Sequence, residues 1–437
     1  MDDTEYDVIA VGGGFAGVAA AQRAAKRGLN VLLLDKHPFH QFQPLLYQVA
    51  TSQIAVASVA RPLRAIFRPQ RRRVQVKIAE VTAIDPSAHT VTTSDGTVFR
   101  GGSLVVGIGA EANFFNTPGA QEHAYPLYSV ADATALASRL LGLIDGATSG
   151  GAPQPFDVVV VGGGPTGVET AGAIAENFTY VIAHYISPSF AAACTVHLVD
   201  MVDQVLTPFS SASQKYAHER LVKAGVHVKL GSGVTEVTGE KVTLADGTVI
   251  QTPLVVWAGG LKGGSLLSEA GLPLGRGGRV DVAPDLSVPG FERVYALGDA
   301  ANIPDGKGGA LPQLGSVAQQ SGAWAGDNIH AQLSGRDTKP FAYRDKGIMA
   351  MIGKGAAVAE IGHKRRGLRG SFAFLAWLAV HAMLLSGVWQ RISAVISWGW
   401  DYFTHRRPHV VVYRPEEYAG GHAVASRPAR GDDASSH

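Results

Sequence analysis

An apolar run, a glycine-rich turn and a helical pattern stand at the start of the chain. Residues 7–11 are mostly apolar and β-branched, the sequence GGGFAG follows at 12–17, and an alanine-rich stretch extends to Gly28, a typical helix stop. Residues 30–35 then have the pattern of a second buried strand. This order predicts one β-α-β unit.

The same order of positions returns in the middle of the chain. Residues 157–161 lead into GGGPTG at 162–167, and a later strand pattern ends at Asp200. Asp-Gly-Thr hairpin turns at 95–97 and 246–248 also occupy matching places. An internal repeat of this kind predicts two domains of one type.

Two segments interrupt the repeat. The Gly/Pro/Ser-rich residues 143–155 are typical of a linker. The second copy also has more residues between its glycine turn and its acidic strand end than the usual roughly 20. We interpret residues 177–193 as an insertion that accounts for the excess.

Both glycine turns match G-x-G-x-x-G in the context that binds a dinucleotide. The first glycine permits the tight turn, the second lets the backbone approach a pyrophosphate, and the third allows close packing of helix and strand. The helix N-terminus then offers partial positive charge to the phosphates. Glycines of ordinary turns are the simpler interpretation, but two copies in full context argue against it. The residues are Gly12, Gly14, Gly17, Gly162, Gly164 and Gly167.

Carboxylates end three of the predicted strands. Asp35 and Asp200 can each accept hydrogen bonds from a ribose diol, and Asp200, without an arginine for a 2′-phosphate, favours NADH over NADPH. Asp299 follows the strand pattern at 291–297. In flavoproteins with two dinucleotide sites, an aspartate at this place usually binds the flavin ribitol. A helix-capping role for Asp299 is compatible with that function.

Composition narrows the function classes. The chain has 437 residues, of which 46% are hydrophobic and 17% charged, and its net charge is +2. These values are typical of a globular protein and argue against nucleic acid as a partner. Cys194 is the only cysteine, so an internal disulfide, a Cys-x-x-Cys redox pair or a thiolate metal cluster is excluded, and no metal site is predicted. The short N-terminus leaves no room for a signal peptide, which predicts a protein that faces the cytoplasm.

The C-terminal region contains a long apolar stretch. Residues 372–389, as one helix, would be about 27 Å long, just short of the roughly 30 Å hydrocarbon core of a bilayer. Residues 389–404 form an amphipathic pattern with Trp, Tyr and Arg. We favour a helical anchor on a membrane surface over 372–404; a buried helix pair or a dimer interface is the alternative. We interpret His381 as a hydrogen-bonded interior histidine.

The chain resembles type II NADH:quinone oxidoreductases, the single-subunit, non-pumping NADH dehydrogenases. The resemblance rests on HQFQPLLYQVA at 40–50, GGGPTGVE at 162–169 and the C-terminal region, and it extends from residue 6 to about residue 412. It implies FAD on the first β-α-β unit and NADH on the second. The implied FAD contacts are Gly12, Gly14, Gly17, Asp35, Lys36, Gln43, Ala110 and Asp299. The implied NADH contacts are Gly162, Gly164, Gly167, Asp200 and Gly260.

The resemblance also implies residues around the flavin ring and the acceptor. Glu169 matches a family glutamate near the flavin–nicotinamide interface, although a carboxylate favoured by the helix dipole explains it equally well. The family pattern Ala-Gln-x-Ala-x-Gln reads GSVAQQ at 315–320, so Gln320 matches and Ser316 replaces the first glutamine. Gln43, Pro44 and Tyr47 would line the acceptor side.

The expected fold is α/β, with two Rossmann-type dinucleotide-binding domains and a C-terminal helical membrane-surface anchor. The expected boundaries are 1–112 and 265–345 for the two parts of the FAD-binding domain, 113–264 for the NADH-binding domain, 346–412 for membrane association and 413–437 for a disordered tail.

The expected function is FAD-dependent oxidation of NADH with two-electron reduction of ubiquinone or menaquinone, without proton pumping, at the cytoplasmic face of the membrane. A homodimer is compatible with the apolar C-terminal helices. One alternative is a soluble NADH reductase that passes electrons to a small carrier protein. Another is a redox-sensing flavoprotein with little turnover. Ser316 motivates the first of these alternatives.

Overall fold

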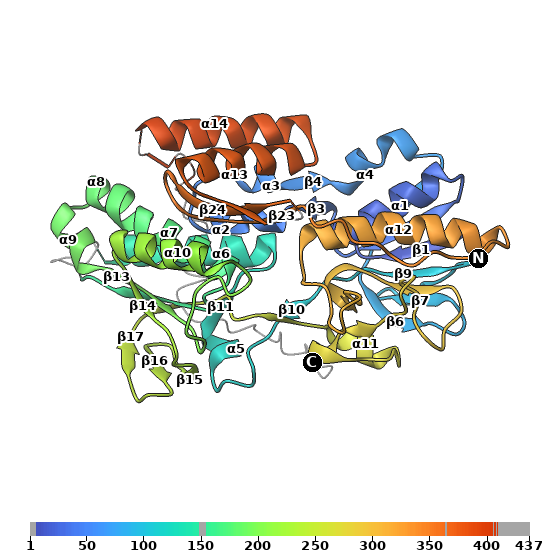
Figure 1. Ribbon diagram of the computed structural model, residues 1–437, viewed down its shortest axis with the longest axis horizontal. Helices are drawn as coiled ribbons and strands as arrows, with labels where there is room; N and C mark the ends of the chain where they lie inside the picture. Colours follow the sequence, from blue (N-terminus) through green and yellow to red (C-terminus); the bar gives the residue numbers. More distant parts are fainter. Residues whose placement is uncertain (1–5, 148–153, 363–364, 405, 408, 410–437) are drawn as a thin grey trace, which may run out of the picture.

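The computed structural model describes residues 6–147, 154–362, 365–404, 406, 407 and 409. Two five-stranded parallel sheets lie side by side, with helices against them, and a pair of helices runs along the top of the view in Figure 1. The predicted α/β class is therefore confirmed. The tail predicted for 413–437 lies outside the described residues.

The first sheet has the strand order β21-β9-β1-β2-β5. Every neighbouring pair is parallel, and β9 and β1 are buried along their whole length, as a sheet covered on both faces requires. Helix α12 packs so closely on α1 that a Cβ on Gly322 would lie 2.1 Å from the carbonyl oxygen of Ala16. These elements are β1 (Val8–Val11), α1 (Phe15–Lys26), β2 (Val31–Asp35), β5 (Val74–Ile78), β9 (Leu104–Val106), β21 (Val294–Ala296) and α12 (Gly315–Leu333).

The second sheet repeats the first in the order β11-β18-β12-β13-β14, again all parallel. Its strands are β11 (Ala124–Pro126), β12 (Asp157–Val161), β13 (Thr195–Val199), β14 (Val226–Lys229) and β18 (Leu254–Trp257). Its helices are α6 (Val130–Gly146), α7 (Pro165–Glu176) and α10 (Ser211–Lys223). The chain passes between the sheets through a short antiparallel pair, β10 (Glu111–Ala112) and β19 (Leu261–Lys262).

Each sheet also carries a matching antiparallel three-stranded unit. One contains β6 (Val81–Asp85), β7 (Thr90–Thr93) and β8 (Val98–Arg100), and the other β15 (Val234–Val237), β16 (Lys241–Leu244) and β17 (Val249–Gln251). The predicted hairpin turns join β7 to β8 and β16 to β17, with Gly96 at φ 79° and Gly247 at φ 82°. The internal repeat is thus present in the three-dimensional fold.

The structure gives a conformation to both interruptions of the repeat, and the first differs from its prediction. Helix α6 extends to Gly146, so the first residues of the predicted linker are helical, and residues 148–153 lie outside the described part. The predicted insertion continues α7 as a π-helix (Asn177–Ile182), followed by α8 (Ala183–Tyr185) and α9 (Pro188–Ala193). The excess length of the second copy is therefore mostly helical.

The C-terminal region begins with a sheet that the sequence analysis did not predict. Strands β23 (Gly347–Gly353), β24 (Ala356–Ile361) and β25 (Arg366–Gly370) are antiparallel. Helices α13 (Ser371–Leu384) and α14 (Val388–Thr404) follow. The prediction of one helix over 372–389 is wrong, because Leu385 adopts an extended backbone (φ −58°, ψ 133°) and the apolar stretch turns back on itself.

Helix α14 is amphipathic, as predicted, but its polar side faces the protein. Ser397 is 6% exposed and the Ser393 hydroxyl lies 2.8 Å from the Ser58 hydroxyl, whereas Phe403 is 81% exposed and Trp389 is 66% exposed. This is the reverse of the usual arrangement in a water-soluble protein.

Within the described part of the chain, none of the helices combines the length and the hydropathy needed to cross a bilayer.

The chain after α14 is fixed to the second half of the molecule. Arg407, with a side chain only 2% exposed, pairs with Glu176 at 3.4 Å and with Asp401 at 3.9 Å. It also donates to the carbonyl oxygens of Thr51 (2.6 Å) and Ala173 (3.3 Å). Such a buried cation needs every one of these partners, so the end of α14 is held firmly against α7.

The remaining described elements are short. They are β3 (Phe39–Gln41), α2 (Leu46–Ala50), α3 (Val56–Val59), β4 (Ala60–Pro62), α4 (Leu63–Ile66), α5 (Ala120–His123), α11 (Ser265–Glu269), β20 (Val280–Asp281) and β22 (Ala301–Asn302), with 3-10 turns at Gln43–Leu45, Arg68–Gln70, Arg276–Gly278 and Gly298–Ala300.

Candidate functional site

The two glycine turns have nearly the same geometry. Gly12 and Gly162 have φ values of 101° and 107°, which residues with a Cβ rarely adopt. A Cβ on Gly12 would lie 2.3 Å from the carbonyl oxygen of Gly107, and one on Gly162 would lie 2.4 Å from that of Ala258. Only glycine fits the first position of either turn.

The other two glycines of each turn have opposite surroundings. A Cβ on Gly17 or Gly167 would lie 1.8 Å from the carbonyl oxygen of the first glycine of its own turn. A Cβ on Gly14 or Gly164 would meet no atom within 4 Å. Each turn thus leaves open space in front of a helix N-terminus, which is the arrangement that a pyrophosphate requires.

Asp35 and Asp200 stabilise the turns in the same way. One carboxylate oxygen of each accepts the amide of the middle glycine, Gly13 or Gly163. The other oxygen accepts the amide two residues beyond the aspartate, at 2.6 Å in the first copy and 3.1 Å in the second. Because a carboxylate oxygen has two lone pairs, each aspartate can still accept a hydrogen bond from a ribose hydroxyl.

Asp299 has a partner that the sequence analysis missed. The Tyr128 hydroxyl donates to Asp299 at 2.9 Å and accepts the amide of Ala110 at 3.2 Å. Burial raises the pKa of Asp299, and the Tyr128 hydrogen bond opposes that rise. Gln41 holds the tyrosine segment from the other side, because its side chain bonds the carbonyl oxygen of Tyr128 and the amide of Val130. No motif distinguishes Tyr128 in the sequence.

The segment after β3 contains Gln43, Pro44 and Tyr47. The side-chain oxygen of Gln43 is buried and has no hydrogen-bond partner among the described residues, which is unusual for a buried polar atom. Tyr47 is 3% exposed, and its hydroxyl contacts the Met351 sulfur at 3.4 Å and the Gln48 amide at 3.0 Å. Tyr47 therefore lies in the core. Lys36, a predicted FAD contact before this segment, is exposed.

Glu169 is a buried carboxyl group on the first turns of α7. Its oxygen accepts the Met351 amide at 3.0 Å. Burial raises the pKa of Glu169 to about 8, against a smaller opposing effect of that hydrogen bond and of the Trp377 indole. Burial therefore favours the neutral form of Glu169, which the positive end of the helix dipole does not attract.

Ser316 and Gln320 contact one segment. The Ser316 hydroxyl lies 2.9 Å from the Tyr343 hydroxyl. Gln320 bonds the amide and the carbonyl oxygen of Arg344, at 3.0 and 3.1 Å. Residues 343–344 continue into β23, which contains Met351. This segment therefore connects the start of α12 to the Met351 amide that bonds Glu169.

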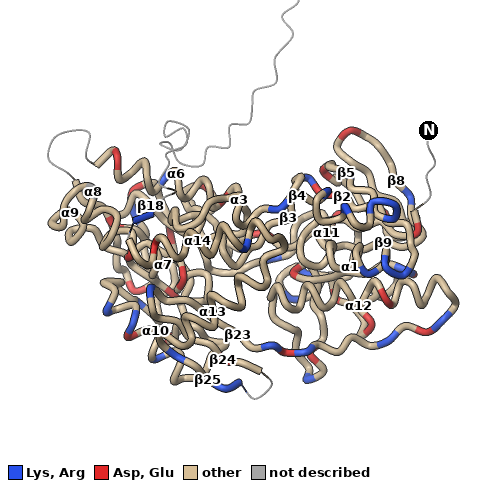
Figure 2. The backbone as a smooth tube through the Cα atoms, turned by 90° about the horizontal axis from the view of Figure 1, so that it is seen from above, with Lys and Arg blue, Asp and Glu red and all other residues tan. Residues whose placement is uncertain are grey.

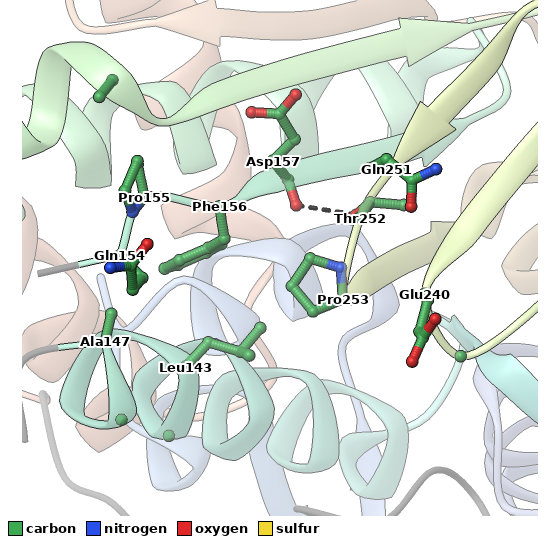
Figure 3. Close-up of a pocket in the computed structure, with 14 residues that line it drawn as sticks. Leu143, Ala147, Gln154, Pro155, Phe156, Asp157, Glu240, Gln251, Thr252 and Pro253 are labelled. Atoms are coloured by element: carbon green, nitrogen blue, oxygen red, sulfur yellow. Dashed lines mark hydrogen bonds between the residues drawn. The ribbon is translucent and has the colours of Figure 1, made fainter. Parts of the chain in front are cut away.

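The pocket of Figure 3 lies at the end of the second sheet where the strands begin, opposite the end that carries the glycine turn. Asp157 begins β12 and Pro253 precedes β18, and the Thr252 hydroxyl donates to the Asp157 carbonyl oxygen at 2.8 Å. Ligands of parallel α/β sheets bind at the carboxyl ends of the strands. The pocket is therefore separate from the dinucleotide site.

Gly260, the remaining predicted NADH contact, lies just after β18 with φ 137°. It follows the carboxyl end of a strand next to β12, so the fold brings it to the same edge of the sheet as the second glycine turn.

Known proteins share this architecture. The pyridine nucleotide-disulphide oxidoreductase family model matches residues 6–322. The chain is 33% identical to the type II NADH:quinone oxidoreductase Ndh of Mycobacterium tuberculosis, over 95% of this chain and 92% of the relative. It is 34% identical to NdhA of the same organism, over 95% and 91%. The fold matches that of NDH2 from Plasmodium falciparum in complex with NADH, with a TM-score of 0.84 and 18% identity over 92% of this chain and 99% of that one. The chain therefore belongs to the type II NADH:quinone oxidoreductases, within the pyridine nucleotide-disulphide oxidoreductase family.

Proposed function

We propose that this protein oxidises NADH and reduces a membrane quinone, with FAD as the bound cofactor that links the two reactions. The paired glycine turns are the observation that carries the proposal, because two equivalent turns at the carboxyl edges of two sheets suit two dinucleotides. Membership of the family supports the overall reaction. Bound FAD would supply the redox chemistry, and the protein would supply position and electrostatics.

The first turn fits FAD. Its open space at Gly14 can receive the pyrophosphate, Asp35 can accept a ribose hydroxyl, and Asp299 can accept ribitol hydroxyls. The unpartnered oxygen of Gln43 fits a donor supplied by a ligand. The proposed FAD contacts are Gly12, Gly14, Gly17, Asp35, Lys36, Gln43, Ala110 and Asp299.

The second turn fits NADH. Asp200 accepts two backbone amides and would repel the 2′-phosphate of NADPH, which favours NADH as donor. The proposed NADH contacts are Gly162, Gly164, Gly167, Asp200 and Gly260. The corresponding domains are 1–112 with 265–345 for FAD, 113–264 for NADH and 346–412 for membrane association.

The acceptor side involves Glu169, Gln320, Ser316, Pro44 and Tyr47. A neutral Glu169 can hold a proton near the site, and Ser316 and Gln320 fix the segment that leads to Met351. The apolar outer face of α13 and α14 favours a quinone that enters from a membrane surface. The proposed location is the cytoplasmic side of that membrane. The proposal includes no proton pumping.

A turnover assay tests the function. We expect NADH to bleach the yellow protein much faster than NADPH does, and a short-chain quinone to restore the colour. Ser316→Gln, which restores the family glutamine but removes the hydroxyl pair with Tyr343, should change the KM for quinone several-fold while the rate of flavin reduction by NADH stays the same.

Two results would contradict this function. Protein that stays colourless after addition of FAD would exclude it altogether. Rapid reduction by NADH without quinone turnover would instead favour the carrier-protein or sensor alternatives. Gln319→Ala, at an exposed position on the same helix, is the matched control for Ser316→Gln and should leave both steps unchanged.

Tyr128→Phe tests how Asp299 is positioned. Loss of the hydroxyl removes a hydrogen bond to a carboxylate, worth roughly 1.5–3 kcal/mol, and leaves the oxygen that it contacts without this donor. We expect FAD to dissociate more readily, with a Kd about 10-fold higher or more, as measured by flavin fluorescence. Tyr295→Phe is the control, because the Tyr295 hydroxyl bonds Gln332 at 3.0 Å. An equal loss of FAD in both variants would show a general effect of removing a buried hydroxyl.

A further inference from the structure

An arginine-rich segment lies on the half of the molecule that carries the first sheet. Residues 61–73 contain six arginines, and residues 36–79 contain no aspartate or glutamate. The chain as a whole has a net charge of only +2. The positive charge of this segment is therefore a local feature that the overall composition conceals.

The segment has an apolar side and a charged side. Leu63, Ile66 and Phe67 are 0%, 6% and 2% exposed and belong to the core around the first sheet. The arginines between and after them are exposed: Arg64, Arg68, Arg71, Arg72 and Arg73. Buried apolar residues thus fix the backbone, while the guanidinium groups extend toward solvent.

None of the arginines at 61–73 has an ion-pair partner in the described part of the chain. Four of them also lack a side-chain hydrogen bond there: Arg64, Arg68, Arg71 and Arg72. Some exposed arginines elsewhere do have one: Arg27 pairs with Asp327 at 2.7 Å and Arg365 pairs with Asp345 at 2.9 Å. A cluster of arginines without counter-charge repels itself. It is therefore suited to an external anionic partner.

The start of the segment contacts the turn between α13 and α14. The Arg61 guanidinium donates to the carbonyl oxygen of Ser386 in that turn. The Gln390 side chain contacts the carbonyl oxygen of Ala60 at 3.4 Å. In Figure 1, α14, α13, β4 and α4 lie along the same, upper side of the molecule, and Figure 2 shows that side from above. Arg61 and Arg64, on β4 and α4, therefore lie on the same side of the molecule as the exposed apolar face of the two helices.

That apolar face suits hydrocarbon. Phe372, Val388 and Phe403 are 80%, 72% and 81% exposed. The chain has no aspartate or glutamate from residue 362 to residue 400, so neither part of this surface repels anions. An apolar patch bordered by unpaired arginines matches the apolar interior and charged headgroups of an anionic bilayer surface.

We propose that the arginine segment 61–73 binds the anionic headgroups of a membrane while the apolar face of α13 and α14 enters the lipid. This inference rests on the proposed membrane location and adds a lipid preference to it. Each arginine near an anionic surface contributes roughly a fivefold increase in affinity at low salt, and salt weakens the effect. The first half of the molecule then lies flat against the membrane beside the anchor helices.

Vesicle binding by the full-length holoenzyme tests the proposal. The variant carries Arg64→Gln, Arg68→Gln, Arg71→Gln and Arg72→Gln. The vesicles consist of phosphatidylcholine alone or of phosphatidylcholine in which roughly a third of the lipid is the anionic phosphatidylglycerol. We expect wild-type protein to prefer anionic vesicles in a salt-dependent way. The variant should bind them about 30-fold more weakly or worse, yet bind neutral vesicles as wild type does.

A matched control removes the same charge elsewhere. It carries Arg100→Gln, Lys307→Gln, Arg276→Gln and Arg336→Gln, all at exposed positions in other parts of the chain, and should retain wild-type affinity for anionic vesicles. Equal weakening in both variants would overturn the proposal, because only net charge would then count. Unchanged binding by the 61–73 variant would overturn it too.

A third variant separates this proposal from the membrane location itself. Trp389→Ser with Phe403→Ser changes only the apolar face, and should lose binding to both kinds of vesicle. If it binds normally, the membrane location fails. If it loses binding while the 61–73 variant does not, only the lipid preference fails. Retention on double-stranded DNA at 150 mM salt that depends on the four arginines, with no lipid preference, would likewise overturn the proposal.

Discussion

Gly164→Val is expected to raise the KM for NADH about 100-fold while FAD stays bound, a loss of about 2.7 kcal/mol. A Cβ at Gly164 meets no protein atom within 4 Å, and the φ of −70° is one that valine adopts. The fold should therefore tolerate valine. The new side chain would fill the space in front of the helix N-terminus, where the pyrophosphate of NADH binds in our proposal.

The repeat supplies the converse experiment. Gly14→Val has the same open surroundings and a φ of −74°, so it should yield folded protein that lacks FAD. Steady-state kinetics and the flavin absorbance per protein distinguish the two outcomes. Gly146→Ala, which also meets no atom within 4 Å, is the control and should change neither. Loss of FAD from Gly164→Val would reverse the assignment of the two cofactors.

Glu169→Gln is expected to remove a pH dependence of stability. The pKa of Glu169 is about 8 in the folded protein and 4.5 as its ordinary value. Between these values the folded state binds more protons than the unfolded state, so the free energy of unfolding falls as the pH rises through this window and levels off above it. One proton gives a slope of at most about 1.4 kcal/mol per pH unit.

The glutamine keeps the oxygen that accepts the Met351 amide but cannot ionise. Denaturant unfolding at pH 5, 6, 7 and 8 should therefore show a flatter profile for the variant, and the pH profile of quinone reduction should lose its limb near pH 8. Glu219→Gln, at an exposed position on α10, is the control. Equal slopes for wild type and Glu169→Gln would mean that the carboxyl group is ionised in the folded protein.

The repeat was predictable because it depends on local rules. A strand, a turn that only glycine can form and a helix follow one another within about 30 residues, and the clashes at Gly12 and Gly162 show why no other residue fits there. The hairpins at Gly96 and Gly247 were predictable for the same reason.

Long-range contacts were not predictable in this way. Tyr128 meets Asp299 across 171 residues, and Met351 meets Glu169 across 182. The role of the tyrosine hydroxyl or of the methionine amide depends on which distant residue it reaches, and no sequence periodicity encodes that. The raised pKa of Glu169 follows from burial, which is also a property of the folded chain.

The anchor region shows both sides of this division. The apolar and amphipathic patterns over 372–404 can be recognised in the sequence. The turn at Leu385 and the outward apolar face depend on how the helices pack. Only the contact between Arg61 and Ser386 shows that the arginine segment 61–73 begins next to the anchor helices.

By itself, the sequence determined the two dinucleotide-binding units and the family resemblance, because short-range backbone rules specify them. Only the tertiary structure decided the state of Glu169, the partner of Asp299 and the surface shared by arginines and apolar helices. Each of these depends on burial or proximity between residues far apart in the chain.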